Sequence, residues 1–269
     1  GKLKGAKQGE RAVVRITEWQ GKSKNPVGEV VELLSQEREN EIAMKEILVE
    51  NGFPLRFSET VIKQAESLPD SLAADEIKKR KDCRDILTFT IDPADAKDFD
   101  DALSIRTLKN GNIEVGVHIA DVSHYVLPDT ELDVEAYERA TSVYLPDRVL
   151  PMLPEHISNN LCSLRPDEDK FTFSVIFQLN RKGTVKQFWI GRTVIHSDRR
   201  FAYEDAQKII EEKKGELSDE ILLLHEIAEN LRSERFKKGA INFSSQEVRH
   251  KLDEKGLPLG VEIKESKEA

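Results

Sequence analysis

An aspartate-rich loop between two strand-like segments constrains the fold more than any other feature of this chain. Residues 90–104, TIDPADAKDFDDALS, contain five aspartates: Asp92, Asp95, Asp98, Asp100 and Asp101. Apolar and polar side chains alternate along residues 85–91 before the loop, and a second strand-like segment begins at Ala102. The acids therefore lie where two strands meet a loop, and we expect them to be close together in space.

The crowding of these acids favours a bound metal ion. Carboxylates within a few ångströms of one another cannot all stay ionised unless a positive charge joins them, and Lys97 is the only basic residue among them. Mg²⁺ and Mn²⁺ prefer carboxylate oxygen and water as ligands. The loop therefore predicts a carboxylate cage that binds metal and leaves room for a phosphate, as two-metal sites do.

Two other interpretations of the loop are disfavoured. A solvated acidic turn is the general alternative for an acid run, but Pro93, Ala94 and Phe99 interleave the acids, unlike a disordered acidic tail. A calcium loop of the helix–loop–helix type requires Gly at its sixth position, where counting from Asp98 gives Leu103.

The composition limits the classes to which the protein can belong. No apolar run approaches the roughly 18 residues of a membrane span, and the basic N-terminus lacks the apolar core of a signal peptide. Cys83 and Cys162 lie far apart without CxxC spacing, which predicts reduced thiols in a cytoplasmic protein. The net charge of −9 argues weakly against nucleic-acid binding, which depends on local basic patches.

Strand and helix patterns alternate along the chain. Strand patterns cover residues 11–19, 27–34, 113–119, 171–177, 185–197 and 241–263, with turn signals at 110–111, 182–183 and 254–256. Helical patterns cover residues 40–51, 58–68, 133–141, 203–212 and 218–238, the last as a long amphipathic helix that ends at Gly239. Residues 142–166 contain four prolines and predict a rigid loop with little helix or strand.

Two further polar residues lie near the clearest strand. His118 is out of phase with the apolar face of residues 113–119, which favours a structural, hydrogen-bonding histidine over a metal ligand. Asp121 lies at the far end of the same strand, and it would approach Asp101 if the hairpin is symmetric about residues 110–111.

Four motifs in order resemble one nuclease family. They are the acid loop, GVHIADVSHYV (116–126), SVYLPDRVLPMLPE (142–155) and SNNLCSL (158–164). Together they closely resemble the ribonuclease II/ribonuclease R family of processive 3′→5′ exoribonucleases, with bacterial ribonuclease R as the nearest branch. The resemblance covers residue 84 to the C-terminus.

The resemblance implies an α+β fold of mostly antiparallel sheets with packed helices. Residues 84–269 would be the N-terminal part of an RNB catalytic domain, and residues 36–83 a helical linker. Residues 1–35 resemble the last strands of an OB-type cold-shock domain, with lysines that either blunt a solvated strand edge or contact phosphates. The family's catalytic arginine would lie beyond this chain, so we expect the fragment itself to be inactive.

The resemblance also assigns roles to individual residues. Asp92 and Asp101 would hold one Mg²⁺, Asp98 would support that shell, and Asp100 would organise the second ion or the attacking water. Tyr144 matches the family's tyrosine that stacks on the 3′-terminal nucleotide of single-stranded RNA, since base stacking tolerates any sequence. The second stacking aromatic would fall near His250, where this sequence departs from the family.

Three expectations about function follow. The first is Mg²⁺-assisted (or Mn²⁺-assisted) hydrolysis of RNA to nucleoside 5′-monophosphates, by in-line attack of water on the last phosphodiester. The alternatives are a non-catalytic RNA-binding module with an incomplete catalytic fold, and a metal-dependent phosphatase of small phosphoesters. Apolar surface left uncovered by a missing half would also favour self-association.

Overall fold

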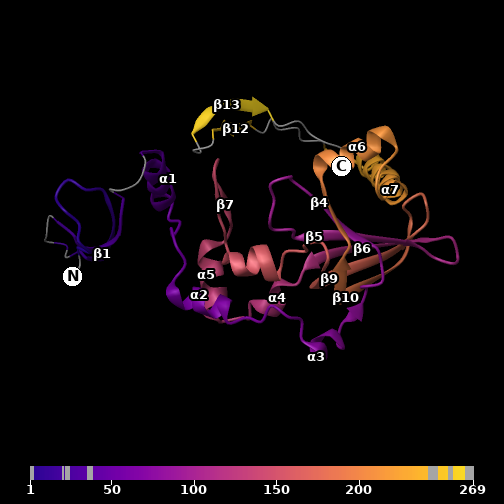
Figure 1. The fold of residues 1–269 in the computed structure, drawn as a ribbon, viewed down its shortest axis with the longest axis horizontal. Helices are drawn as coiled ribbons and strands as arrows, with labels where there is room; N and C mark the ends of the chain where they lie inside the picture. The colour runs from indigo at the N-terminus through magenta and orange to yellow at the C-terminus, as the bar shows by residue number, and fades with distance from the viewer. Residues whose placement is uncertain are drawn as a thin grey trace. The chain divides into compact units, whose positions relative to one another are not determined.

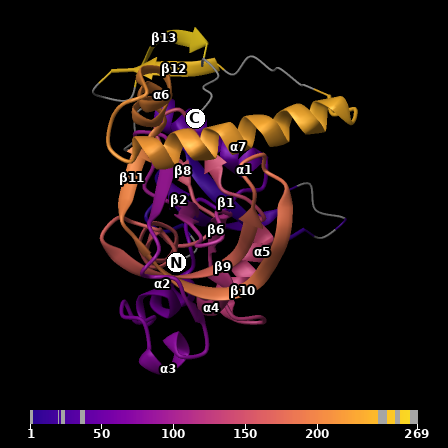
Figure 2. The same ribbon diagram turned by 90° about the vertical axis from the view of Figure 1, so that its right-hand side faces the viewer.

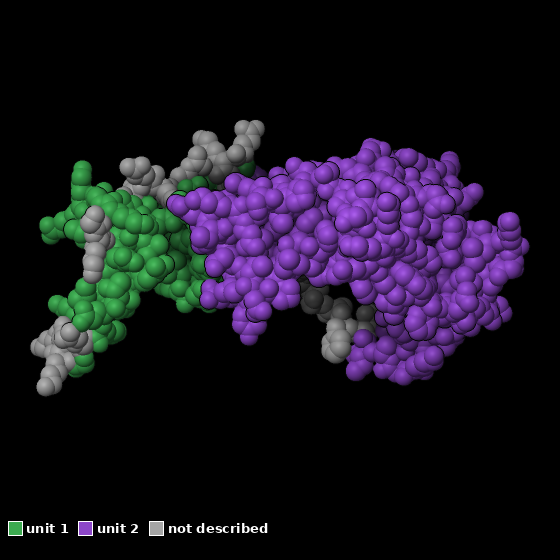
Figure 3. All heavy atoms as spheres, turned by 90° about the horizontal axis from the view of Figure 1, so that it is seen from below, with its two compact units in different colours: residues 1–57, 253–257 green, residues 58–252, 258–269 purple. Residues whose placement is uncertain are grey.

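The chain folds into two compact units. The computed structural model describes residues 3–19, 21, 25–34, 39–241, 248–253 and 257–263 (Figure 1). One unit comprises residues 1–57 with 253–257, and the other comprises residues 58–252 with 258–269 (Figure 3). Across the described ranges, no helix combines the length and the apolar character that a bilayer crossing requires.

The first unit pairs two strands and adds one helix. Strand β1 (Ala12–Glu18) runs antiparallel to β2 (Val27–Leu33), with Ala12 opposite Leu33, and α1 (Glu39–Glu50) follows. Val30 and Leu34 from the strand side are buried, as are Ile42 and Leu48 of α1. Both predicted strands and the predicted helix over 40–51 are confirmed.

The second unit is built on a seven-stranded sheet in the order β11-β4-β5-β6-β9-β10-β3. Its strands are β3 (Lys81–Asp82), β4 (Thr88–Asp92), β5 (Asp101–Thr107), β6 (Ile113–Ala120), β9 (Glu168–Leu179), β10 (Val185–Ser197) and β11 (Arg199–Ala202). The five central strands are antiparallel, and the two short outer strands pair in parallel with β4 and β10. Gly111 and Gly183 adopt positive φ at the two predicted hairpin turns, as those turns require.

One face of this sheet carries the apolar core. Phe89, Ile105 and Phe201 are buried there, with Ile209 of α6 (Tyr203–Glu212) and Ile221 of α7 (Ser218–Lys237). Because alternate residues of a strand point to one face, Ile113 and Val115 from the alternating stretch 113–119 contribute to this core, whereas Ile119 at its end is exposed. The mixed architecture of antiparallel sheet and packed helices is the fold class that the sequence predicts.

Helix α7 is amphipathic over only its first half. Ile221 and Ile227 are buried, but every residue from Ala228 to Ala240 is exposed. Figure 2 shows the long helix with its C-terminal end extending away from the sheet. The predicted bounds and the cap at Gly239 (φ +96°) are confirmed, and the helix buries apolar side chains over its first half.

The opposite face of the sheet carries buried polar side chains. His118 lies between Ser104 and Ser174, and its ring nitrogens are 2.8 Å and 2.7 Å from their hydroxyl oxygens. Ser174 also hydrogen-bonds to Thr193, which contacts Thr172. Buried polar groups are stable only when they are paired, so this cluster gives the sheet a specific register.

The second unit contains further short helices and strands. They are α2 (Glu59–Glu66), α3 (Ala74–Ile77), α4 (Val122–Tyr125), α5 (Glu131–Arg139), β7 (Val143–Tyr144), β8 (Val149–Leu150), a π-helix (His156–Leu161), β12 (Val248–Leu252) and β13 (Pro258–Ile263). The Ser58 hydroxyl accepts a hydrogen bond from the Val61 amide at the start of α2, as an N-cap should. The predicted turn at 254–256 lies outside the described residues.

The proline-rich segment 142–166 contains more regular structure than its composition suggests. Strands β7 and β8 pair with each other, and the six-residue π-helix follows them. The expectation that this segment largely lacks continuous helix or strand holds for most of its length, and the π-helix is the exception. Its prolines lie outside the π-helix, so they interrupt none of its hydrogen bonds.

Candidate functional site

The acid loop joins β4 to β5 at one end of the sheet. Asp92 is the last residue of β4 and Asp101 the first of β5, while Asp98 and Asp100 lie in the connecting segment. The two strands are antiparallel, with Phe89 opposite Leu103, so their acid-bearing ends are adjacent. The predicted position of the acids, where two strands meet a loop, is confirmed.

The acids influence one another electrostatically. Burial raises the pKa of Asp92, which is 8% exposed, and the negative charges of Asp101 and Asp98 raise it further. Burial of its carboxylate likewise raises the pKa of Asp100, and the three other acids add to the effect, although Asp100 as a whole residue is exposed. Concentrated negative charge of this kind needs a compensating cation.

The Asp92 carboxylate has unused bonding capacity. Its Oδ2 atom is buried and lacks a hydrogen bond of good geometry, although the nearby Thr90 hydroxyl lowers the pKa of this carboxylate; such an oxygen is unfavourable when charged unless a cation or water reaches it. Four carboxylates also match the oxygen ligands that Mg²⁺ and Mn²⁺ prefer. Within the described ranges, however, no three histidine, cysteine, aspartate or glutamate side chains converge closely enough to enclose an ion. The residues therefore fit a divalent cation in charge and in donor type, although the described side chains do not form a closed set of ligands.

Tyr144 lies near the same acids. It belongs to β7 and is 70% exposed, so its ring is accessible. Partial burial of its hydroxyl raises its pKa, and the negative charges of Asp98 and Asp100 raise it further. The structure thus brings the predicted stacking tyrosine within electrostatic range of two predicted acids.

Asp121 lies outside the acid cluster. Asp101 is opposite Ile119, which places Asp121 nearby in the backbone, but the Asp121 carboxylate is 2.7 Å from Nη1 of buried Arg80. Burial would raise the pKa of Asp121, yet the Ser123 hydrogen bond and the Arg80 ion pair outweigh it and hold the pKa below its usual range. Asp121 is thus part of a structural ion pair.

His118 is buried in the sheet, whereas His250 is exposed. Both ring nitrogens of His118 contact serine hydroxyls in the buried polar cluster, so the prediction of a structural histidine is confirmed. His250 is exposed on β12, opposite Val261 in the two-stranded ribbon β12–β13. Its assignment as an RNA contact stays a prediction.

Sequence reasoning missed the residues that hold the acid loop in place. Arg200 donates a hydrogen bond to the Pro93 carbonyl, its guanidinium lies 5.4 Å from the Phe99 ring centroid, and its charge opposes the rise in the Asp92 pKa. Ser163 hydrogen-bonds to the backbone at Lys97 and Phe99. Ser163 belongs to the motif SNNLCSL, which was a usable signal, whereas nothing local marks Arg200.

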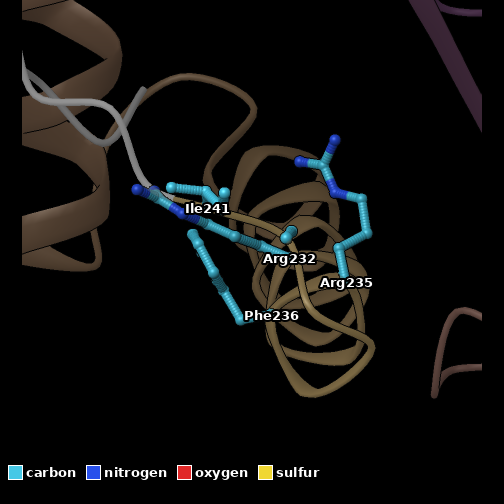
Figure 4. A pocket seen from close by; sticks show the side chains of 5 residues that line it. Arg232, Arg235, Phe236 and Ile241 are labelled. Carbon is cyan, nitrogen blue, oxygen red and sulfur yellow. The ribbon is translucent and has the colours of Figure 1, made fainter.

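Two hollows in the surface of the described residues lie away from the acid loop. One of about 340 Å³ lies at the C-terminal end of α7 and is lined by Arg232, Arg235, Phe236, Ala240 and Ile241 (Figure 4). Another, of about 650 Å³, is lined by residues within 70–77, 125 and 160–170. Neither of the two is lined by a predicted site residue.

Comparison with known families matches both units. The RNB domain family matches residues 80–269, and the cold shock domain family matches residues 1–58. The cold shock match ends at residue 58, which agrees with the division of the structure after residue 57.

Individual relatives support the same grouping. DIS3-like exonuclease 2 of Schizosaccharomyces pombe is 41% identical over 273 residues, covering 95% of this chain and 29% of the relative. Ribonuclease R of Aquifex aeolicus is 39% identical over 261 residues, covering 95% of this chain and 37% of the relative. The chain thus spans about a third of the length of these curated relatives.

A solved structure extends the likeness to the fold. Ribonuclease R of Mycoplasma genitalium, in complex with ribose-methylated single-stranded RNA, superposes with a TM-score of 0.84 at 28% identity, covering 96% of this chain and 41% of that one. The acid loop, the antiparallel sheet that presents it and the family matches agree with one another. The chain is a member of the RNB domain family, with a cold shock domain match preceding the RNB domain.

Proposed function

We propose that this chain is part of a metal-dependent 3′→5′ exoribonuclease that hydrolyses RNA to nucleoside 5′-monophosphates. The observation that carries the proposal is the acid loop, where burial and mutual repulsion raise the pKa values of Asp92 and Asp100. A cluster this acidic repels a phosphate unless cations bound to the carboxylates neutralise the negative charge. The exonuclease and ribonuclease R names of the relatives support RNA as the substrate.

Each acid has a role that its position supports. Asp92, buried with one free carboxylate oxygen, and Asp101, directly across the loop on β5, would hold one Mg²⁺ or Mn²⁺. Asp98 would support that shell, and Asp100 would orient the attacking water or hold a second ion. When bound, such ions make water a better nucleophile and neutralise charge on the phosphate.

Tyr144 would position the substrate. Its exposed ring can stack on the 3′-terminal base, a contact that is worth about 1–3 kcal/mol and does not depend on base identity. Because Tyr144 lies near Asp98 and Asp100, stacking there would place the last phosphodiester beside the acids. This arrangement suits a nuclease that shortens single-stranded RNA from its 3′ end without sequence preference.

Mn²⁺ titration of this chain, followed by thermal stability, tests the metal site. We expect Mn²⁺ to raise the melting temperature of the wild type and of Asp95→Asn, but not of Asp92→Asn. Asp95→Asn is the matched control, because it removes one charge from the same loop at a position outside the four acids. Equal stabilisation of all three proteins would contradict the assignment of Asp92 as a ligand.

A non-catalytic RNA-binding module is the alternative function. The yeast pseudonuclease Ssd1 shares the fold, with a TM-score of 0.66 at 23% identity, so the fold alone does not establish catalysis. Release of nucleoside monophosphates by a full-length protein, lost in Asp100→Asn while RNA binding persists, would establish catalysis. RNA binding without monophosphate release would favour the alternative, and release from a chromogenic phosphoester would favour a phosphatase.

A further inference from the structure

The segment that follows the π-helix packs directly against the acid loop. Ser163 is fully buried, and its hydroxyl accepts a hydrogen bond from the Phe99 amide (3.1 Å) and donates one to the Lys97 carbonyl (2.8 Å). The next residue, Leu164, donates its amide to the Phe99 carbonyl at 2.8 Å. These bonds link two segments that are more than 60 residues apart in the sequence.

The two hydrogen bonds of Ser163 fall on either side of Asp98. A serine hydroxyl has one proton to donate and lone pairs to accept, so a single side chain holds the backbone both before and after this acid. The backbone is held again one residue later, where the Ala120 amide of β6 donates to the Asp100 carbonyl at 2.9 Å. The backbone from Lys97 to Asp100 is therefore fixed at successive points, and with it the directions of the Asp98 and Asp100 side chains.

The π-helix supplies a firm support for Ser163. Its wider turn is closed by the Cys162 amide, which donates to the Ile157 carbonyl five residues earlier. Its Asn160 carbonyl accepts a hydrogen bond from Nζ of Lys170, a buried residue of β9, at 2.6 Å. Because β9 pairs with a neighbouring strand on each side, the segment that carries Ser163 is connected to the interior of the sheet.

We propose that Ser163 is a positioning residue, whose hydroxyl sets the conformation of residues 97–100 and so aims the carboxylates of Asp98 and Asp100. The role of those two carboxylates in metal binding rests on the proposed function. The pair of hydrogen bonds from Ser163 to the backbone of Lys97 and Phe99, here called the clamp, is present in the chain without metal. Groups that orient metal-binding or catalytic side chains typically affect them strongly without touching the ligand.

Hydrogen exchange in the metal-free chain tests the clamp. We expect Ser163→Ala to speed exchange of the Phe99 amide, measured by NMR, by about tenfold or more, because the amide loses the hydroxyl that accepts its hydrogen bond. Ser163→Cys, which keeps the volume but bonds weakly, should resemble Ser163→Ala. Ser163→Thr keeps the hydroxyl and should restore slow exchange.

Ser174→Ala is the matched control for lost stability. Ser174 is also a fully buried serine with a bonded hydroxyl, but its partners are His118 and Thr193 and not the acid loop. We expect Ser174→Ala to lower overall stability while Phe99 exchange stays within about threefold of the wild type. Equal acceleration in Ser174→Ala and Ser163→Ala, or wild-type exchange in Ser163→Ala, would overturn the clamp.

Mn²⁺ affinity of the same variants tests the consequence. We expect Ser163→Ala to raise the Mn²⁺ dissociation constant of this chain by about tenfold or more, with recovery in Ser163→Thr and no change in Ser174→Ala. An unchanged dissociation constant in Ser163→Ala would overturn the positioning role. If the wild type binds no Mn²⁺, the proposed metal site fails, while the exchange measurement still decides whether Ser163 fixes the loop.

Discussion

His118 shows how a single buried residue can couple this fold to pH. Its ring is fully buried between the hydroxyls of Ser104 and Ser174, and burial lowers its pKa to about 4. The neutral ring has one donor and one acceptor nitrogen, and each serine can take either role. The folded protein therefore holds this histidine uncharged at neutral pH.

We predict that His118 makes the protein less stable in mild acid. The unfolded chain takes up a proton on this ring below the ordinary pKa of 6.5, whereas the folded chain does not until about pH 4, so stability falls as the pH drops between these values. Between pH 7 and pH 5 the loss should be on the order of 2 kcal/mol, and urea unfolding at both pH values should show it. His118→Gln should lose this part of the pH dependence; an unchanged slope in the variant would contradict the assignment.

The residues of the acid loop divide into those that the sequence reveals and those that it does not. The four acids lie within ten positions of one another, so their spacing alone predicts a shared site, and the exposed Tyr144 near them agrees with the resemblance. Ser163 and Arg200 reach the loop from more than 60 and more than 100 residues away. Their roles depend on tertiary contacts, which a local pattern does not contain.

At the scale of elements, β6 depends on a glycine at its centre. A Cβ atom at Gly116 would overlap the Ser104 hydroxyl and lie 2.5 Å from Nε2 of His118. Those two groups are hydrogen-bonded to each other and buried, so neither can move away cheaply. The glycine is therefore a requirement of the polar cluster rather than of a turn.

We predict that Gly116→Ala destabilises the second unit by about 2 kcal/mol, through overpacking and the disruption of the His118–Ser104 bond. Chemical denaturation should measure the loss. Gly260→Ala on β13 is the control, because no atom lies within 4 Å of a Cβ atom built at that position. Comparable stability for the two variants would show that the sheet adjusts around the added methyl group.

Local sequence patterns predict where a helix or strand lies better than they predict which element it pairs with. Alternation marks residues 113–119 as a strand, and Asn110-Gly111 marks the turn before it, so β5 and β6 are predictable as a hairpin. The parallel pairing of β11 with β4 joins residues more than 100 positions apart, and no local signal announces it. The π-helix is likewise unpredicted, because its wider hydrogen-bonding pattern has no distinct residue spacing to reveal it.

At the scale of the whole molecule, the sheet has an exposed apolar edge. Only Thr193 and Val194 of β10 pair with β3, and no described strand pairs with the outer side of residues 185–192. Phe188 and Ile190 on this stretch are 63% and 52% exposed. Phe188 and Ile190 are opposite Phe177 and Val175 of β9, which point to the same face of the sheet as Phe173. Phe173 and its partner Ile119 are exposed too, so all four apolar side chains lie on one face.

An unpaired, apolar strand edge beside an exposed apolar face favours association between copies of a chain. We therefore predict that this chain self-associates through β10, and that sedimentation velocity over a range of concentrations will show a mass above 30.6 kDa that rises with concentration. Ile190→Lys should shift the distribution toward the monomer, because it places a charge on the exposed edge. Val134→Lys, at an exposed apolar position on α5, adds the same charge elsewhere and should leave the association unchanged. A wild-type chain that stays monomeric at high concentration, or two variants that dissociate equally, would show that the edge of β10 does not drive assembly.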